Sequence, residues 1–460
     1  MSDWTLCIDF GTAFSKAAAA PYDSWTRFDP RHVRPLMLGG VQETGNAFLL
    51  ESAVFVDDDA VLFGRAAMAR ADALTHKKRM ALRSFKTLLS VSDLDRALNT
   101  NAPLSIDPHR AFQMRDLVVL YLAYLLAAVD AAAAYDQMVS KATGVEFRYA
   151  APAWRSGDSA GLHPSVVRLF GEAESFRLAV GEDMLHPEGV SFQAVNDFLP
   201  RAQTNPEAFE MGLIFEATAA AAYSSIGLQD SGSHMIVVDM GAGTTDIAAL
   251  ARTRRGVEEL PSARVTLKQA GDFIDRTIAN TVIDASRWAK TPQQKTDLWN
   301  ALMRNMRDIK ETIFAEGAAS LRHEGRVIRI GMKDLERQRE FKMFVKSVND
   351  AYEQGLSAVR EHAAARGAGE VQAVAVGGGA AAPFIKDLIR KKPKTRINVR
   401  PRPATPDWAH AREFAGNLAP VFPQLAIAIG GALAPAEMLA ASGGFNPPAT
   451  GRTGIRTARD

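Results

Sequence analysis

Two short stretches of the sequence combine an aspartate, glycines and a threonine directly after an apolar run. The first reads Asp9-Phe10-Gly11-Thr12, and the second reads Asp239-Met240-Gly241-Ala242-Gly243-Thr244. A glycine after a strand lets backbone N–H groups come close to an anion, because it has no Cβ and tolerates a positive φ. Threonine hydroxyls add neutral hydrogen-bond donors. We therefore expect both stretches to be loops that hold phosphate groups.

The aspartates in these stretches indicate that a metal ion accompanies the phosphate. A carboxylate repels a phosphate group, whereas a magnesium ion attracts both and keeps several waters that carboxylates can orient. Asp9, Asp239 and the nearby Asp246 are therefore a candidate carboxylate set around a metal–phosphate group. An Asp-Gly pair is also an ordinary turn, and for one copy alone that interpretation is favoured. Two copies, with a third glycine turn at Gly377-Gly378-Gly379, favour phosphate binding.

Strands and helices that could position these loops can be recognised along the chain. Each glycine turn follows a continuous apolar run, as expected for a strand buried on both faces. These runs are Thr5–Asp9, His234–Asp239 and Val371–Val376. Long segments without an internal proline predict helices at Met114–Val139, Glu207–Ile226, Asp272–Ala289, Lys295–Glu316 and Glu340–Arg366. The mixture predicts an α/β protein, and one aspartate-glycine loop in each half predicts two similar lobes that face one cleft.

Six stretches of the chain together resemble a known family. They are CIDFGTAFSK, VVDMGAGTTD, VAVGGGAAAPFIKDLI, FEATAAAAYSSIGL (Phe215–Leu228), LAIAIGGAL (Leu425–Leu433) and YAAPAWR (Tyr149–Arg155). In this order they resemble the two phosphate loops, the adenosine loop, the two connecting segments and a short strand of the DnaK-type heat-shock chaperone ATPase domain. That domain belongs to the actin-like superfamily, and the resemblance covers residues 1–440. It implies a two-lobed actin-like ATPase, with ribonuclease-H-like lobes of mixed sheets and flanking helices around a central nucleotide cleft.

The resemblance also implies roles in binding and hydrolysing Mg-ATP. Asp9 and Asp239 would hold the magnesium ion through water. Thr12, Glu216 and Asp246 would join these two aspartates in catalysis, with Glu216 positioning the attacking water or the metal's shell. ATP or ADP would be held by Gly11, Thr12, Ala13 (a threonine in the family), Gly241, Ala242, Gly243, Thr244, Thr245, Gly271, Lys310, Gly377, Gly378 and Gly379. Without the resemblance, Glu216 and Lys310 would be ordinary charges on helix surfaces.

Three positions depart from the family pattern in ways that affect chemistry. Met68 stands where the family has a catalytic lysine, and a methionine cannot stabilise charge that develops on a phosphoryl group. Arg65 and Lys86 are both candidates to replace that lysine. Gly379 and Ala381 stand where the family has a serine and an arginine that contact the base, which leaves base selectivity open. We therefore expect nucleotide binding with slow hydrolysis.

The composition is that of an ordinary globular protein. The 460 residues are 47% hydrophobic and 23% charged, with a net charge of +2, so no global charge attracts nucleic acid or a membrane. The basic run Lys386–Arg402 has no aromatic residues for base stacking and predicts a solvated surface. Cys7 is the only cysteine, which fits a reducing compartment. No secretory signal is recognisable, and the apolar segment Leu117–Val129 is too short to span a bilayer. We expect a cytoplasmic protein without a membrane span.

The domain organisation follows from the order of the motifs. We expect lobe I over residues 1–228, lobe II over 229–421, a helix over 422–442 that returns to lobe I, and a disordered tail over 443–460. Because only about 20 residues follow the last connecting segment, no peptide-binding domain is expected. The resemblance then implies a slow Mg-dependent ATPase that acts as a nucleotide switch for an unknown partner protein. An actin-like bacterial filament protein, a small-molecule kinase and a catalytically silent nucleotide sensor remain open as alternatives.

Overall fold

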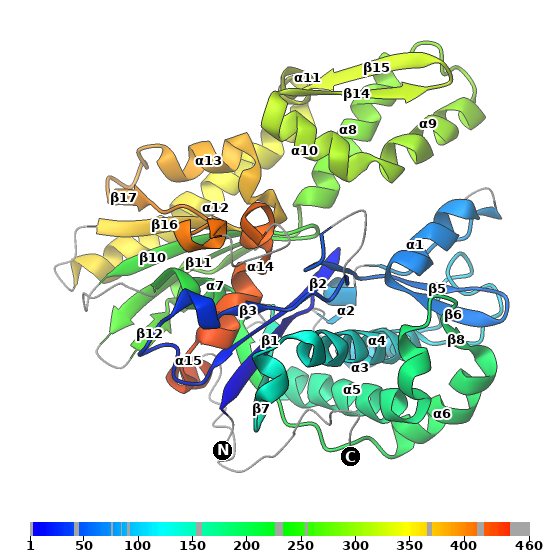
Figure 1. Cartoon of the computed structure of the whole chain (residues 1–460). Coiled ribbons are helices and arrows are strands. Elements are labelled where there is room, and N and C mark those ends of the chain that lie inside the picture. The colour runs from blue at the N-terminus through cyan, green and yellow to red at the C-terminus, as the bar shows by residue number, and fades with distance from the viewer. Residues whose placement is uncertain are drawn as a thin grey trace. The chain divides into compact units, whose positions relative to one another are not determined.

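The computed structural model of the protein divides into two compact units (Figure 1). It describes residues 3–40, 46–74, 77–83, 85–89, 93–152, 159–225, 233–253, 256–365, 370–411 and 418–441. The first unit comprises Met1–Gln229, Thr253–Glu259 and Thr405–Asp460, and the second comprises Asp230–Arg252 and Leu260–Ala404. The tail expected to be disordered, 443–460, lies outside the described residues.

The first unit is built on a mixed sheet whose central strand ends at the first aspartate-glycine loop. Its strands are β1 (Trp4–Asp9), β2 (Phe14–Pro21), β3 (Arg34–Pro35), β4 (Leu50–Glu51), β7 (Val145–Ala151) and β9 (Gly212–Phe215). The order is β3-β2-β1-β7-β9, with β4 paired to β2. β1 runs antiparallel to β2 and parallel to β7, and every residue of β1 is buried. The expected strand buried on both faces is confirmed.

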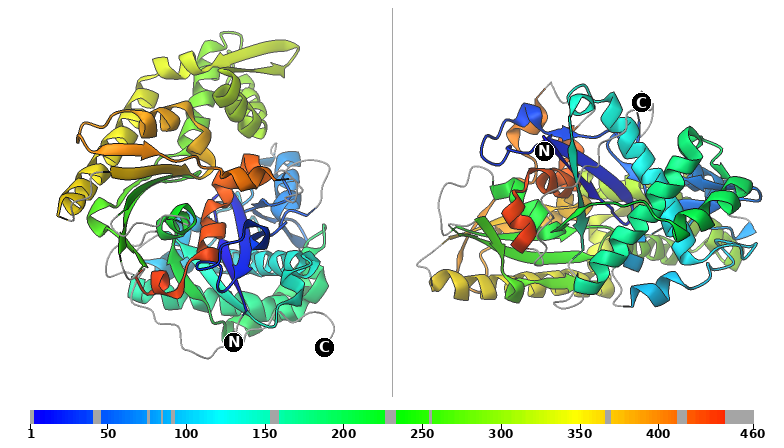
Figure 2. Two further views of the ribbon diagram at one scale, coloured as in Figure 1. Left: turned by 60° about the vertical axis from the view of Figure 1, so that its left-hand side comes forward. Right: turned by 90° about the horizontal axis from the view of Figure 1, so that it is seen from below.

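Helices cover both faces of this sheet (Figures 1 and 2). α4 (Met114–Tyr135), α5 (Ser159–Val180) and α6 (Phe192–Thr204) share one hydrophobic core with Leu6 and Ile8 of β1. α7 (Glu216–Ser225) and α14 (Leu418–Leu433) lie on the opposite face, and the short α15 (Ala436–Ala441) follows α14. α7 and α14 cross very closely, since a Cβ added at Gly430 would lie 1.8 Å from the carbonyl oxygen of Ala219. This contact gives a physical reason for the small residues in both connecting segments.

α4 is the central core helix of the first unit. It has 22 residues, so it is longer than its most apolar stretch, and by length and composition it could cross a membrane. However, 78% of its most apolar window is buried inside the protein, and its side chains pack against β1 and α5. The expectation of a core helix is confirmed by this burial rather than by the length of the apolar run.

A smaller sheet accompanies the main sheet of the first unit. It consists of β5 (Val54–Val56), β6 (Ala60–Phe63) and β8 (Val190–Ser191) in that order. β6 leads directly into α1 (Gly64–Ala73), and two short helices follow, α2 (Phe85–Leu89) and α3 (Leu94–Leu98). α2 carries Lys86, one of the two candidate replacements for the family's lysine.

The second unit repeats the strand pattern of the first. β10 (His234–Met240) runs antiparallel to β11 (Thr245–Thr253) and parallel to β16 (Glu370–Val376), as β1 does to β2 and β7. β17 (Asn398–Pro401) extends the sheet beyond β16, and β13 (Val265–Leu267) pairs with β11. β12 (Gly256–Glu259), which follows β11 in the chain, is grouped with the first unit. The motif that occurs twice in the sequence therefore belongs to a topology that also occurs twice.

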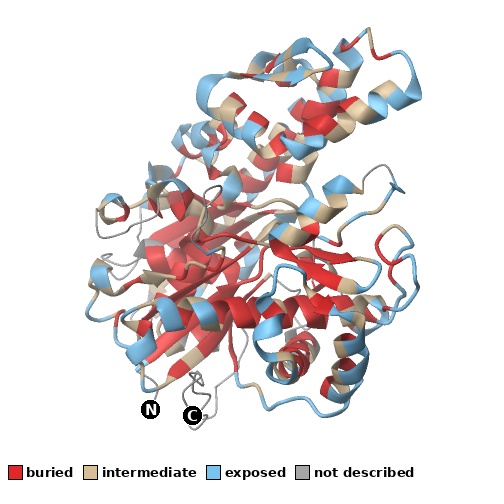
Figure 3. Cartoon of the chain, turned by 45° about the vertical axis from the view of Figure 1, so that its right-hand side comes forward, coloured by how far each residue is buried: buried red, intermediate tan, exposed pale blue. Residues whose placement is uncertain are grey.

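Helices and a hairpin complete the second unit. They are α8 (Gly271–Ala285), α9 (Pro292–Arg304), α10 (Met306–Glu316), β14 (Ala318–His323), β15 (Arg326–Gly331), α11 (Met332–Arg337), α12 (Arg339–Ala364) and α13 (Pro383–Arg390). α8, α12 and α13 share the core of the sheet. Figure 3 shows the sheet strands as buried and the β14–β15 hairpin as largely exposed.

The mixed α/β fold class is confirmed, and two of the expected helices need correction. Residues 207–211 are not helical, and Gly212–Phe215 forms β9 beside β7, so only Glu216–Ser225 of the expected helix exists. A short apolar run fits a buried strand as well as a helix. Here the run forms a strand because it can pair with the edge of β7. The expected helix Lys295–Glu316 is two helices that end and begin at Asn305.

Candidate functional site

The first aspartate-glycine loop joins β1 to β2 and requires glycine at its centre. A Cβ added at Gly11 would lie 2.2 Å from the carbonyl oxygen of Phe14 and 3.0 Å from Nζ of Lys16. Ser52 fixes the turn, because its hydroxyl donates to the carbonyl oxygen of Gly11 at 2.9 Å. Thr12 and Ala13 follow on the turn and are partly exposed. The loop thus presents backbone and a threonine at the carboxyl end of β1, as a phosphate loop requires.

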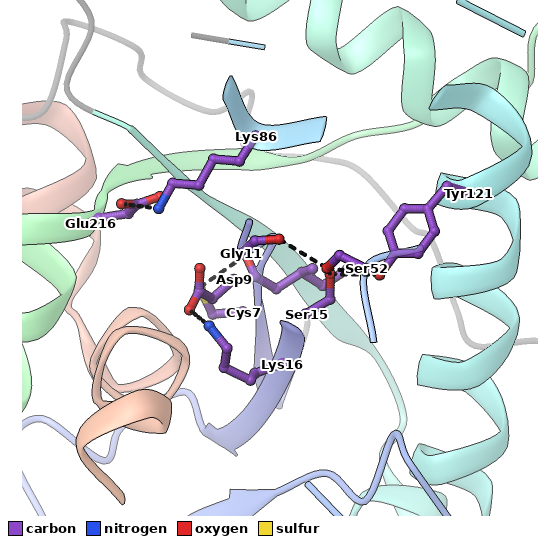
Figure 4. Close-up of polar contacts among 10 residues, drawn as sticks. Cys7, Asp9, Gly11, Ser15, Lys16, Ser52, Lys86, Tyr121 and Glu216 are labelled. Carbon is purple, nitrogen blue, oxygen red and sulfur yellow. Dashed lines mark hydrogen bonds and ion pairs between the residues drawn. The ribbon is translucent and has the colours of Figure 1, made fainter. Parts of the chain in front are cut away.

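Asp9, at the end of β1, is buried and paired with a lysine that the sequence analysis did not single out. Oδ2 of Asp9 lies 2.5 Å from Nζ of Lys16, the residue directly across the β1–β2 ladder (Figure 4). Oδ1 of Asp9 is also buried and accepts no hydrogen bond from the described residues. A buried carboxylate oxygen without a donor is costly, so this atom suits a water held by a metal ion.

A second buried ion pair in the first unit joins Lys86 and Glu216. Nζ of Lys86 on α2 lies 2.6 Å from Oε2 of Glu216, the first residue of α7 (Figure 4). The exposed fractions of the two side chains are 14% and 6%. Of the two candidate replacements for the family's lysine, Lys86 is therefore the one at Glu216. Arg65 is exposed on α1, and Met68 packs against an apolar cluster that includes Phe55.

The charges of both pairs act on the same buried groups, so they share one region of the first unit. Burial raises the pKa of the Tyr149 phenol far above its usual range, and the charge of Glu216 adds to the rise, while Lys86 opposes it and Asp9 adds to it. Burial likewise raises the pKa of the Cys7 thiol, and Asp9 and Glu216 contribute to that rise. Two carboxylates and two ammonium groups therefore lie in one buried region near the carboxyl end of β1.

The second aspartate-glycine loop has carboxylates at both of the corresponding ladder positions. Asp239 lies directly opposite Asp246 in the β10–β11 ladder. Asp246 accepts hydrogen bonds from the hydroxyls of Thr244 at 2.8 Å and Thr266 at 2.6 Å. Like charges directly opposite each other destabilise a ladder, and a cation beside them removes that cost. This pair fits the expectation that Asp239 and Asp246 lie near a magnesium ion.

The start of α8 is bound to this second loop. The N–H of Gly271 donates to the carbonyl oxygen of Gly241 at 3.1 Å, and the N–H of Asp272 donates to that of Ala242 at 2.8 Å. A Cβ at Gly271 would lie 3.2 Å from the Gly241 oxygen and 3.4 Å from Nζ of Lys310. Lys310 itself lies 2.7 Å from Oδ1 of Asp275. The second loop, Gly271 and Lys310 are therefore neighbours.

The third glycine turn also packs against the end of β10. Gly377 has a φ of +80°, and a Cβ there would lie 2.4 Å from Oδ1 of Asp239 and 2.5 Å from the carbonyl oxygen of Met240. Gly378 and Gly379 continue the turn, which leads into α13 at Pro383. Adjacent parallel strands thus end in two glycine turns, at the edge where α/β sheets bind their ligands.

The structure brings the expected residues together within each unit. Residues gathered in the first unit are Asp9, Gly11, Thr12, Ala13 and Glu216. Those gathered in the second are Asp239, Gly241, Ala242, Gly243, Thr244, Thr245, Asp246, Gly271, Lys310, Gly377, Gly378 and Gly379. A common cleft for both sets stays a prediction. Within the described residues no three His, Cys, Asp or Glu side chains form a direct metal site.

Lys16 is the residue that the sequence analysis missed, and one signal could have revealed it. Lys16 follows Asp9 at the same spacing at which Asp246 follows Asp239. The two are the antiparallel ladder partners of their aspartates. If the two aspartate-glycine stretches are aligned past their glycines, Lys16 falls opposite Asp246, which would have marked it as a site residue.

Comparison with known proteins agrees with this geometry. A family model described as "Hsp70 protein" matches residues 210–400, a range that includes α7 and most of the second unit. The fold and this match support a nucleotide-binding member of the actin-like ATPase superfamily. Among individual proteins, the chain is similar to the actin-like protein MamK of Magnetospirillum gryphiswaldense (42% identical over 55 residues) and of Paramagnetospirillum magneticum (45% over 49). These alignments cover 12% and 11% of this chain and only 14% and 13% of the relatives' length.

Proposed function

We propose that the protein is a DnaK-like nucleotide switch that binds ATP and ADP with magnesium and hydrolyses ATP slowly. One observation carries the proposal. In the second unit, three glycine-containing segments meet at the carboxyl ends of β10 and β16 beside the Asp239–Asp246 pair. This arrangement lies within the stretch that matches the Hsp70 model.

The residues of the second unit suit distinct parts of such a ligand. Backbone N–H groups and hydroxyls of Gly241–Thr245 would hold phosphate oxygens, and Asp239 would orient water on a metal ion. A Cβ at Gly377 would collide with Asp239 and Met240, and one at Gly271 would be tight against the Gly241 oxygen, so both segments can lie this close to the end of β10 only as glycine. Magnesium would supply charge neutralisation at the phosphates.

The first unit would supply charges to the hydrolysis step. Lys86 takes the place of the lysine lost at Met68, because it reaches Glu216 from α2. A cation at this position stabilises charge that develops on the transferred phosphoryl group, and Glu216 orients the attacking water. Lys16 adds a second cation next to Gly11. We infer that hydrolysis is slow because both lysines must leave carboxylate partners before they can act.

Isothermal titration of the full chain with Mg-ATP tests the binding step. Binding is expected at micromolar concentrations of nucleotide, with Gly271→Val as the matched variant that fills the space beside Gly241 and Lys310. Absence of heat for the folded wild-type protein would contradict the proposal. Binding without phosphate release above the buffer control would instead indicate a silent sensor, and release that depends on an added metabolite would indicate a small-molecule kinase.

A second candidate function is that of an actin-like filament protein. The two relatives named "Actin-like protein MamK" favour it. ATP-dependent light scattering and a pelletable polymer would support this function. A protein that stays monomeric with ATP, while a pull-down recovers one defined partner in an ATP-dependent manner, would support the switch.

A further inference from the structure

The turn 377–382 of the second unit, which the resemblance places beside the base of the nucleotide, carries no side chain that could read a base. Residues 377–382 are Gly-Gly-Gly-Ala-Ala-Ala, so the whole described loop lacks a side-chain hydrogen-bonding group. Gly379 and Ala381 stand where the DnaK-type family, by the resemblance, has a serine and an arginine. Gly378 and Ala381 are exposed, and a ligand base lying on this turn would meet only backbone and methyl groups.

Met240 occupies the space that a side chain at position 379, such as the family's serine, would need. A Cβ added at Gly379 would lie 2.4 Å from Cγ, 2.6 Å from Sδ and 2.8 Å from Cβ of Met240. Met240 is fully buried in the core of the unit, so its side chain has little room to withdraw. The volume beneath the turn is therefore filled by a thioether, which donates no hydrogen bond.

The backbone of the turn is also partly used internally. The N–H of Ala380 donates to the carbonyl oxygen of Gly377 at 3.2 Å, and the N–H of Ala382 donates to that of Gly379 at 3.0 Å. The nearby cation, Lys310, is held by Asp275 on the side of Gly271 and the phosphate loop. In the proposed function that side would hold the phosphates and the ribose, which ATP and GTP have in common.

We propose that this site binds ATP and GTP with similar affinity, an inference that rests on the proposed nucleotide-binding function. Adenine carries an amino donor where guanine carries a carbonyl acceptor. A site discriminates strongly between such analogues only when it commits fixed polar groups to one of them. The turn 377–382 commits no side chain, and Met240 blocks one at position 379.

Competition binding on the full chain provides the test. Mg-ATP and Mg-GTP would each displace a fluorescent ATP analogue, and the two dissociation constants are expected to agree within about fivefold. A preference for ATP or GTP of more than about thirtyfold overturns the inference and leaves the proposed function intact. If neither nucleotide binds the folded protein, both fail together.

Two variants test whether the base lies on this turn. Ala381 is exposed, so Ala381→Arg offers a guanidinium that can stack on a purine without disturbing the core, and it should tighten both nucleotides about 2- to 20-fold. Ala381→Met, of similar length but with neither a charge nor a group that donates a hydrogen bond, is the comparison and should tighten both nucleotides less than Ala381→Arg does. Equal effects of arginine and methionine, or none from either, would show that the base lies elsewhere and would overturn the inference.

A double substitution tests the role of Met240. Met240→Ala with Gly379→Ser makes room for a hydroxyl at the turn and should separate the two affinities by at least fivefold, whereas Met240→Ala alone should leave their ratio unchanged. Thermal unfolding confirms that each variant is folded. An unchanged ratio in the folded double variant counts against the inference.

Discussion

Lys16 and Asp246 occupy the same position in the two units: each is the antiparallel ladder partner of the aspartate that ends the preceding strand. The charges at this position are opposite. In the first unit it forms an ion pair with Asp9, and in the second it places a carboxylate opposite Asp239. The two copies of the motif therefore differ in charge: the first pairs its aspartate with a cation, and the second places a further carboxylate opposite its aspartate.

Removal of Lys16 should destabilise the protein strongly. Lys16→Met leaves Asp9, which is 1% exposed, as a buried charge without its cation, and we expect a loss of about 3–5 kcal/mol in the free energy of unfolding. Asp9→Asn combined with Lys16→Met removes both charges and should recover much of that loss. Urea unfolding measures both variants, and a double variant as unstable as the single one would contradict the role given to the pair.

Lys86 should control the rate of hydrolysis more than the affinity for nucleotide. Lys86→Met is expected to lower single-turnover phosphate release about 10²–10³-fold, the range seen when one transition-state donor is removed. Arg65→Met is the matched control, because Arg65 is exposed on α1, and it should leave the rate unchanged. The opposite pattern, a slow Arg65 variant and a normal Lys86 variant, would assign the role to Arg65.

Gly377 should tolerate no side chain. Gly377→Ala combines a φ of +80° with a Cβ 2.4 Å from Oδ1 of Asp239, so it should abolish detectable Mg-ATP binding and lower stability. Gly325→Ala separates the two causes: Gly325 has a φ of +72° but no atom within 4 Å of the added Cβ. The control should lose only the free energy of unfolding that a positive φ costs a residue with a Cβ, about 1 kcal/mol, and it should keep its affinity for Mg-ATP. Equal losses in both variants would exclude the collision as the cause.

The crossing of α7 and α14 should reverse the usual effect of a glycine-to-alanine change. In an ordinary helix this change stabilises by about 1 kcal/mol. Gly430→Ala would place a Cβ 1.8 Å from the Ala219 oxygen, so the helices must separate, and we expect a loss of several kcal/mol, as in other overpacked cores. Chemical denaturation gives the sign directly, and a stabilised variant would show that the crossing is looser than described.

Asp130 should make stability depend on pH. Burial raises the pKa of this carboxyl group from 3.8 to about 6, against the opposing effect of Arg177. The folded protein therefore holds this proton more tightly than the unfolded chain, which favours folding below about pH 4 and is lost as pH rises through about 6. Asp130→Asn should raise the unfolding free energy at pH 7.5 by about 1–2 kcal/mol and change it little at pH 4. A variant that is less stable at pH 7.5 would show that the ion pair with Arg177 outweighs burial.

The sequence predicted the parts of the site that depend on local order. Buried strands ending in glycine turns are local features, so Asp9, Asp239 and Gly377 could be placed at strand ends. The contact between Lys86 and Glu216 could not be predicted, because it joins a short helix to a residue 130 positions away. β9 was mistaken for helix because its apolar run is too short to show a period. The contact that Met240 would make with a Cβ at position 379 depends on how the turn after β16 packs on the end of β10, which no sequence pattern records.

The balanced charges of the first unit have a consequence for ion dependence. Lys16 and Lys86 each already face a carboxylate, so this part of the protein offers a bare polyphosphate little net attraction. A divalent ion would shift that balance by drawing the acidic groups toward itself and leaving the ammonium groups to the oxygens of the incoming nucleotide. Occupancy of such a protein would then follow the free concentration of the divalent ion as closely as that of the nucleotide, so that it would report on two cellular quantities at once.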